Sequence, residues 1–126
     1  MLKIQVCGLS ARESMEVIKN LYPDDVEVFN DPDSIAARKV KNGEMDYYLG
    51  SCLTGGGGSL AIAIPTLGYT NCLVVSKQGN LPNEAKIREM VYKGNHKAFG
   101  YVMTHYKEVV PPLVKALIDK NNGLPQ

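Results

Sequence analysis

The fold is decided by residues 45–68, which read MDYYLGSCLTGGGGSLAIAIPTLG. This stretch begins with Met45 to Gly50, an apolar run of strand length, and passes through four consecutive glycines into an apolar segment. Glycines at a strand-to-helix junction allow positive φ and let backbone N–H groups approach a ligand without interference from a Cβ atom. The stretch therefore predicts one strand, a glycine-rich turn and a following helix.

The same alternation of strand and helix patterns extends along the whole chain. Strand-type runs begin near Lys3, Asp25, Met45, Asn71 and Lys97, at intervals that suit one strand plus one returning helix. The pattern predicts a single three-layer α/β domain over residues 1–120, with residues 121–126 as a frayed tail. We expect a mostly parallel flavodoxin-like or Rossmann-like sheet of four or five strands, with helices on both faces.

Capping residues and helix breakers predict where the helices begin. Ser10 and Glu13 form the pattern of a capping box before the first helix. Asp31 is a candidate N-cap for the second helix, with Pro32 at its first position. Asn83 is the expected N-cap of a later helix.

The C-terminal third of the chain admits two interpretations. Apolar residues between Phe99 and Ile118 fit one helical stripe, but Gly100 and the pair Pro111-Pro112 disfavour one unbroken helix. We therefore predict a fifth strand over residues 97–103 and a final helix kinked at the prolines. The alternative is that residues 97–103 belong to one long kinked helix.

Composition excludes several classes of partner. With 126 residues the chain can bury one ordinary core. Lys and Arg total 14 against 13 Asp and Glu, without a block of like charge, so nucleic acid and membrane surfaces are unexpected partners. The apolar segment 60–67 is too short for membrane insertion, which takes about 18 apolar residues, and the N-terminus does not resemble a secretory signal. We expect a cytoplasmic protein.

The cysteines and histidines do not predict a metal site. Three cysteines and two histidines occur without the spacing of a zinc site, so we expect no metal and free thiols in a reducing compartment. The chain also lacks a Walker lysine and a dinucleotide fingerprint with its acidic partner, so no cofactor can be named from the sequence.

The strand-end loops form the predicted ligand site. In an open parallel sheet, ligands bind at the carboxyl ends of the strands where the strand order reverses. For an order of 2-1-3-4-5, this point lies between the first and third strands. The predicted contacts to a small anionic or polar metabolite are Gly8, Ser10, Ser51, Cys52, Thr54, Gly55, Gly56, Gly57, Gly58 and Ser59. The alternative is that the glycines only permit close helix–sheet packing.

A cysteine nucleophile is the second functional hypothesis. Cys52 lies in the turn near a predicted helix N-terminus, which favours the thiolate and would suit acyl or phosphoryl transfer; a small buried residue is the alternative. Cys7 resembles the phosphocysteine of sugar-phosphotransferase IIB domains in its place in the fold only. It is a weaker candidate, because Arg12 follows one residue too early for the related phosphatases. His105 could reach the site only if the strand order brings it there.

Assembly is the third hypothesis. Residues 60–67 have almost no polar face, and a helix that is apolar all round is deeply buried or covered by another subunit. The segment predicts a possible homo-oligomer through residues 60–67, in which the glycine-rich turn would be purely structural.

Several stretches resemble the YhfU-like family of small bacterial proteins, which carry a domain of unknown function. The likeness is densest in residues 46–57, 61–64 and 68–69, and extends to residues 6–9, 26–29 and 98–100. It covers most of the chain. The family has no established activity, so the resemblance implies a small-metabolite context, such as uptake or catabolism, and identifies no catalytic residue.

Overall fold

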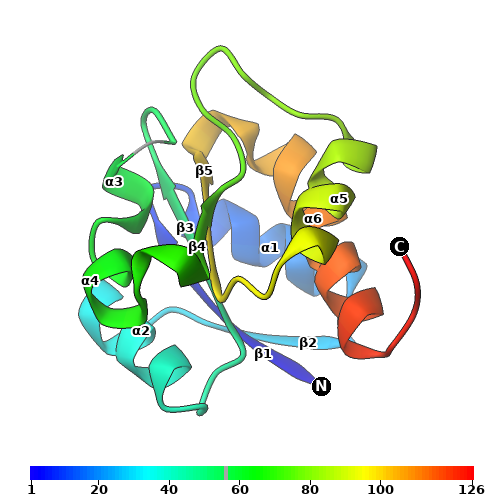
Figure 1. The fold of residues 1–126 in the computed structure, drawn as a ribbon, viewed down its shortest axis with the longest axis horizontal. Helices are drawn as coiled ribbons and strands as arrows, with labels where there is room; N and C mark the ends of the chain where they lie inside the picture. Colours follow the sequence, from blue (N-terminus) through cyan, green and yellow to red (C-terminus); the bar gives the residue numbers. More distant parts are fainter. Residues whose placement is uncertain (56) are drawn as a thin grey trace.

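The computed structural model describes residues 1–55 and 57–126, and its centre is a five-stranded sheet whose paired strands all run parallel. Its order is β2-β1-β3-β5-β4 (Figure 1). The strands are β1 (Leu2–Gly8), β2 (Val26–Phe29), β3 (Tyr47–Cys52), β4 (Cys72–Val74) and β5 (Ala98–Val102). The predicted α/β class is confirmed.

Helices cover both faces of the sheet, as Figure 1 shows. They are α1 (Ala11–Leu21), α2 (Asp33–Lys41), α3 (Gly57–Leu60), α4 (Ala63–Leu67), α5 (Glu84–Lys93) and α6 (Tyr106–Asn121), with short 3-10 turns η1 (Tyr69–Asn71) and η2 (Met103–His105). On one face α6 packs between α1 and α5, and on the other α2 packs against α4. Each face has its own apolar core, one beneath α1, α5 and α6 and the other beneath α2 and α4.

The expected strand order 2-1-3-4-5 is wrong in its last two positions, because β5 lies between β3 and β4. Burial explains the exchange. Every residue of β5 is buried, as a central strand requires, whereas β4 has three residues that are all half-buried and suit an edge. The reversal between β1 and β3 is unaffected, since the connections from these two strands still leave in opposite directions.

A pair of glycines lets α3 rest directly on the sheet. Gly50 of β3 and Gly100 of β5 are paired in register. A Cβ atom on Gly50 would overlap the backbone oxygen of Ser59, and one on Gly100 would overlap the Ser59 hydroxyl. The Ser59 hydroxyl in turn donates to the Gly55 carbonyl at 3.1 Å. The sheet surface is therefore shaped to receive Ser59, and this contact fixes where the glycine-rich turn ends.

Two of the expected helix caps are wrong. Ser10 stands at the N-cap of α1, but its side chain makes no capping hydrogen bond, because it donates to the Ser51 hydroxyl instead. Pro32, and not Asp31, occupies the N-cap of α2. Asp31 instead accepts a hydrogen bond from Lys39 at 3.0 Å, so its carboxylate joins the start of α2 to a later turn of the same helix.

The predictions for the C-terminal part of the chain agree better with the structure. The Asn83 carboxamide oxygen accepts the Lys86 backbone N–H at 2.8 Å, which confirms the predicted cap of α5. Residues 98–102 form a strand, as predicted, and Pro111 and Pro112 both lie inside α6. Beyond α6 the chain remains exposed, and the carbonyl of Leu124 accepts a hydrogen bond from the Tyr92 hydroxyl at 2.8 Å.

We expect Gly100→Ala to lower the free energy of unfolding by about 1–3 kcal/mol, the usual cost of overpacking, because its Cβ would overlap the Ser59 hydroxyl. Adding Ser59→Gly should recover part of this loss by removing the overlapped atoms. Gly58→Ala is the control, since its Cβ would meet the nearest atoms of Cys52 only at 3.4 Å. Urea unfolding gives the free energy of unfolding of the wild-type protein and of the three variants. Equal losses for Gly100→Ala and Gly58→Ala would contradict the packing described here.

Candidate functional site

The predicted loops meet at the reversal point of the sheet. Gly8, at the end of β1, is paired in register with Ser51 of β3. The Leu9 backbone N–H donates to the Ser51 carbonyl at 3.1 Å. Gly8 has a φ of 95°, and a Cβ there would overlap backbone atoms of Ser51. The first loop therefore lies directly against β3, and only a glycine permits so close an approach.

Four hydroxyl side chains form a buried cluster beneath these loops. Ser10 donates to the Ser51 hydroxyl at 2.9 Å, and Ser14 lies 2.6 Å from the Tyr101 hydroxyl. Burial raises the pKa of Tyr101 to about 12, although hydrogen bonds with Ser14, Ser10 and Ser51 oppose that rise. The phenol is therefore neutral near pH 7. Each member satisfies another, so the cluster ties α1 to β3 and β5 without a buried charge.

Two members of this cluster were not among the predicted site residues. Ser14 lies four positions after Ser10, a spacing that places both on one face of a helix. Tyr101 lies on β5 and is paired with Ser51 of β3. This contact could not be predicted from spacing, because it depends on β5 lying beside β3 in the sheet.

Cys52 ends β3 as a half-buried residue within the turn. The Gly55 backbone N–H donates to the Cys52 sulfur at 3.1 Å, and the Thr54 hydroxyl lies 4.0 Å from it. Burial alone would raise the pKa of the Cys52 thiol. Hydrogen bonds from Thr54 and from the backbone N–H groups of Gly55 and Ser59 outweigh this effect, and they hold its pKa below the ordinary value. The turn thus stabilises negative charge on the sulfur.

The other two cysteines have the opposite environment. Cys7 is buried, with its sulfur 3.6 Å from the Asp31 carbonyl. Burial, assisted by the negative charge of Asp33, raises the pKa of Cys7 to about 12. Burial also raises the pKa of Cys72. The geometry therefore favours Cys52 over Cys7 as a nucleophile.

The glycine-rich turn is also hydrogen-bonded to the loop that follows the edge strand β4. The Thr54 carbonyl accepts the Gln78 backbone N–H at 2.9 Å, in the loop that follows β4. Gly55 has a φ of 78°, and a Cβ there would overlap the Ser76 carbonyl. The turn therefore reaches across the end of β5 to the loop after β4.

Ser76 is a site residue that the sequence analysis missed. It is buried, its hydroxyl accepts the Val102 backbone N–H at 3.0 Å, and the same oxygen lies 3.1 Å from Nδ1 of His105. His105 therefore lies at the same edge as the turn, because β5 is the neighbour of β3. His96 precedes β5 and lies at the opposite edge.

The predicted site residues differ in their exposure. Gly8, Thr54 and Gly58 are exposed, Cys52 is half-buried, and Ser10, Ser51, Gly55 and Ser59 are buried. Gly57 is the first residue of α3, and Gly56 lies outside the described residues. The exposed side of the turn also carries Leu53, which is 69% exposed. A ligand would contact this exposed side, above the buried hydroxyl cluster.

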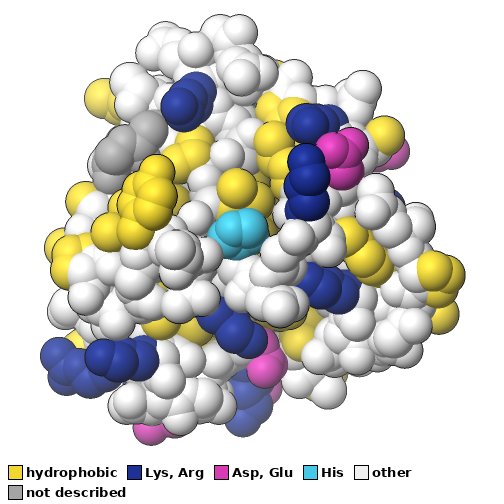
Figure 2. All heavy atoms as spheres, in the orientation of Figure 1, with side chains coloured by type: hydrophobic (Ala, Val, Ile, Leu, Met, Phe, Trp, Pro, Cys, Tyr) yellow, Lys and Arg dark blue, Asp and Glu magenta, His cyan; other side chains and the backbone are white. Residues whose placement is uncertain are grey.

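The apolar segment 60–67 is divided between α3 and α4 rather than forming one helix. Leu60 and Ala63 are buried against the sheet, whereas Ile62 is 42% exposed and Tyr69, just beyond the segment, is 79% exposed. Figure 2 shows apolar side chains gathered over this region of the surface. Self-association through residues 60–67 stays a prediction.

The parallel sheet, the helices on both its faces and the turn at its carboxyl edge define a small Rossmann-like α/β protein. The chain belongs to the family described as "Protein of unknown function DUF2620", whose model matches residues 2–117. It is 38% identical over 117 residues to "Uncharacterized protein YhfU" of Escherichia coli strain K12, covering 93% of this chain and 99% of that protein. The YhfU proteins of Escherichia coli O6:H1 and Shigella flexneri show the same identity and coverage.

Two further features concern the described residues, 1–55 and 57–126. Within them, no helix is both long and apolar enough to cross a membrane. They also contain no group of three or more His, Cys, Asp or Glu side chains placed to hold a metal ion.

We expect Cys52 to react with a disulfide reagent faster than Cys72 or Cys7 at pH 7, because only its pKa is lowered and the thiolate is the reactive form. Variants that each retain a single cysteine, the other two replaced by serine, allow the rates to be compared from pH 6 to 10. The Cys52 rate should reach half its maximum at a lower pH than that of an ordinary thiol, and the Cys72 rate at a higher one. Coincident profiles would contradict the described environment.

Proposed function

We propose that this protein binds a small anionic or polar metabolite over the turn at residues 52–55 and the start of α3, with Cys52 at the centre of the site. The observation that carries the proposal is the hydrogen bond from the Gly55 N–H to the Cys52 sulfur, in a turn at the reversal point of a parallel sheet. This is the part of such folds where ligands bind.

Electrostatics supports an anionic or strongly polar ligand. The lowered pKa of Cys52 means that the turn favours negative charge at its centre, despite the opposing effect of burial. Backbone N–H groups provide this preference and no basic side chain is required, which agrees with a nearly neutral chain of net charge +1.

The surroundings of the turn suit a small ligand with some apolar surface. Leu53 is 69% exposed and Leu9 is 58% exposed, and they lie on the two loops that meet at the reversal point. Thr54, next to Leu53 in the turn, is also exposed. A small metabolite could therefore combine polar contacts at Thr54 and Cys52 with apolar contacts at the leucines.

Catalysis by Cys52 is the second candidate function, and the same hydrogen bond favours it. A thiolate held by N–H donors can attack an acyl carbon or a phosphoryl phosphorus, forming an S–C or S–P bond as the leaving group departs with the electron pair. An acceptor hydroxyl, amine or water would then take the group and return the thiolate. Cys7 is not proposed for this role, because burial raises its pKa to about 12.

Ligand protection of Cys52 tests the binding proposal. In a Cys72→Ser variant, we expect a bound ligand to slow labelling of Cys52, and the panel consists of inorganic phosphate, sugar phosphates and keto acids. A ligand present at a hundred times its dissociation constant should also stabilise the fold by about 2.7 kcal/mol, which is visible as a higher melting temperature.

A matched pair of variants assigns the protection to the turn. Gly58→Val places a branched side chain beside Cys52 and should abolish protection, whereas Ala85→Val, at an exposed position of α5, should leave protection unchanged. Both variants must first show a cooperative unfolding transition. If no panel member protects Cys52 in the folded protein, the proposed ligand class is wrong.

Cys52→Ala separates binding from catalysis. A binding protein without thiol chemistry should show the ligand-induced rise in melting temperature and no covalent adduct on Cys52, and Cys52→Ala should weaken its binding by removing a polar contact. An enzyme should instead show a covalent adduct on Cys52 by mass spectrometry during turnover, and this adduct should disappear in the variant.

A further inference from the structure

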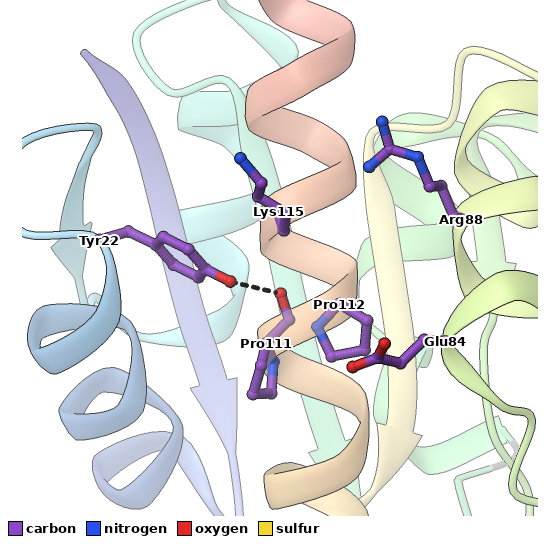
Figure 3. A pocket seen from close by; sticks show the side chains of 6 residues that line it. All are labelled: Tyr22, Glu84, Arg88, Pro111, Pro112 and Lys115. Atoms are coloured by element: carbon purple, nitrogen blue, oxygen red, sulfur yellow. Dashed lines mark hydrogen bonds between the residues drawn. The ribbon is translucent and has the colours of Figure 1, made fainter. Parts of the chain in front are cut away.

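A second pocket lies on the face covered by α1, α5 and α6, and none of its residues belongs to the turn. Its volume is about 170 Å³, and its walls are Tyr22, Glu84, Arg88, Pro111, Pro112 and Lys115 (Figure 3). A larger hollow of about 540 Å³ adjoins it and shares Glu84, Pro111 and Pro112. Three helices thus contribute to one recess.

The two prolines remove two backbone donors from one wall of this recess. A proline has no N–H, so Pro111 and Pro112 deprive the carbonyls of Lys107 and Glu108 of their usual donors four residues later. Lys107 and Glu108 line the adjoining hollow. A proline inside a helix costs about 3 kcal/mol, and locally unfavourable choices of this kind concentrate at functional sites.

Acidic and basic groups lie at different ends of the recess. The Glu84 carboxylate makes no ion pair or hydrogen bond within residues 1–55 and 57–126, and in Figure 3 it lies beside Pro112. Arg88 and Lys115 lie farther along the helices and share one carboxylate, that of Asp119, at 2.8 and 3.2 Å. Arg88 also donates to the backbone oxygens of Pro125 and Gln126. Lys115 has only the Asp119 contact within residues 1–55 and 57–126, so its ammonium keeps donors for a ligand.

Tyr22 extends the acceptor end. Its hydroxyl donates to the Pro111 carbonyl at 3.0 Å, so the hydroxyl proton is committed and the oxygen can only accept from a ligand. The recess thus offers acceptors at Glu84 and Tyr22 and ammonium donors at Lys115, with Arg88 beside it. The carboxylates of Asp119 and Glu84 balance the cations Arg88 and Lys115, so the formal charges around the recess cancel.

We propose that this recess is a binding site for a small zwitterion of the amino-acid type. Its primary ammonium donates to Glu84 and to the Tyr22 hydroxyl oxygen, and its carboxylate accepts from Lys115. A primary ammonium has three donors and no acceptor, which matches a group of acceptors without donors. A molecule without net charge matches the balanced charges of the recess.

The test uses the full chain and a panel of zwitterions, namely the α-amino acids and the linear ω-amino acids of two to six carbons. Binding is followed by two-dimensional ¹H–¹⁵N NMR, with butylamine and butanoate as half-ligands. We expect at least one zwitterion to shift the backbone signals of Glu84, Arg88 and Lys115, and each half-ligand of similar size to bind at least tenfold more weakly.

Charge-removing variants assign the two ends of the ligand. Glu84→Gln and Lys115→Gln should each weaken binding at least tenfold, whereas Glu89→Gln, on α5 but outside the recess, should leave it unchanged. All three side chains are partly exposed, so folded variants are expected. If no panel member shifts these signals, or if the two variants bind as well as the control, the proposal is overturned. Protection of Cys52 is measured separately, so either site can fail without the other.

Discussion

The contact between Ser59 and the glycine pair of the sheet is the constraint on which the rest of the site depends. Because Gly50 and Gly100 have no side chains, α3 approaches the sheet closely enough for Ser59 to lie against both strands. This contact fixes the end of the turn that begins at Cys52. A larger residue at either position would force the helix away from the sheet.

The fold class could be predicted because it depends on local patterns. Alternating strand and helix runs predict the parallel sheet, Asn83 marks the start of α5, and Gly100 argues correctly against one unbroken C-terminal helix. The order of β4 and β5 could not be predicted in the same way. It depends on which strand is wholly buried, and the short run at Cys72 resembles a core strand as much as an edge strand.

The candidate site was predicted as a region, but the roles of its residues required long-range contacts. The sequence predicts Ser10 and Ser51 as ligand contacts, yet their hydroxyls bond each other and help to join the loops. The same limit applies to Ser10 and Asp31, which the sequence predicts as helix caps. Local spacing shows which backbone groups a polar side chain can reach, but a partner brought close by the fold can compete for it, as Ser51 does for Ser10.

The turn is held by parts of the chain that are distant in sequence. The loop after β4 holds Thr54 through Gln78, and close packing of Gly55 on Ser76 fixes its path. Its backbone entropy is therefore lost when the protein folds, and a ligand would meet a turn that is already ordered. The ligand affinity of the proposed site is therefore coupled to the stability of the β4–β5 pair. A change in the loop after β4 would alter binding without contacting the ligand.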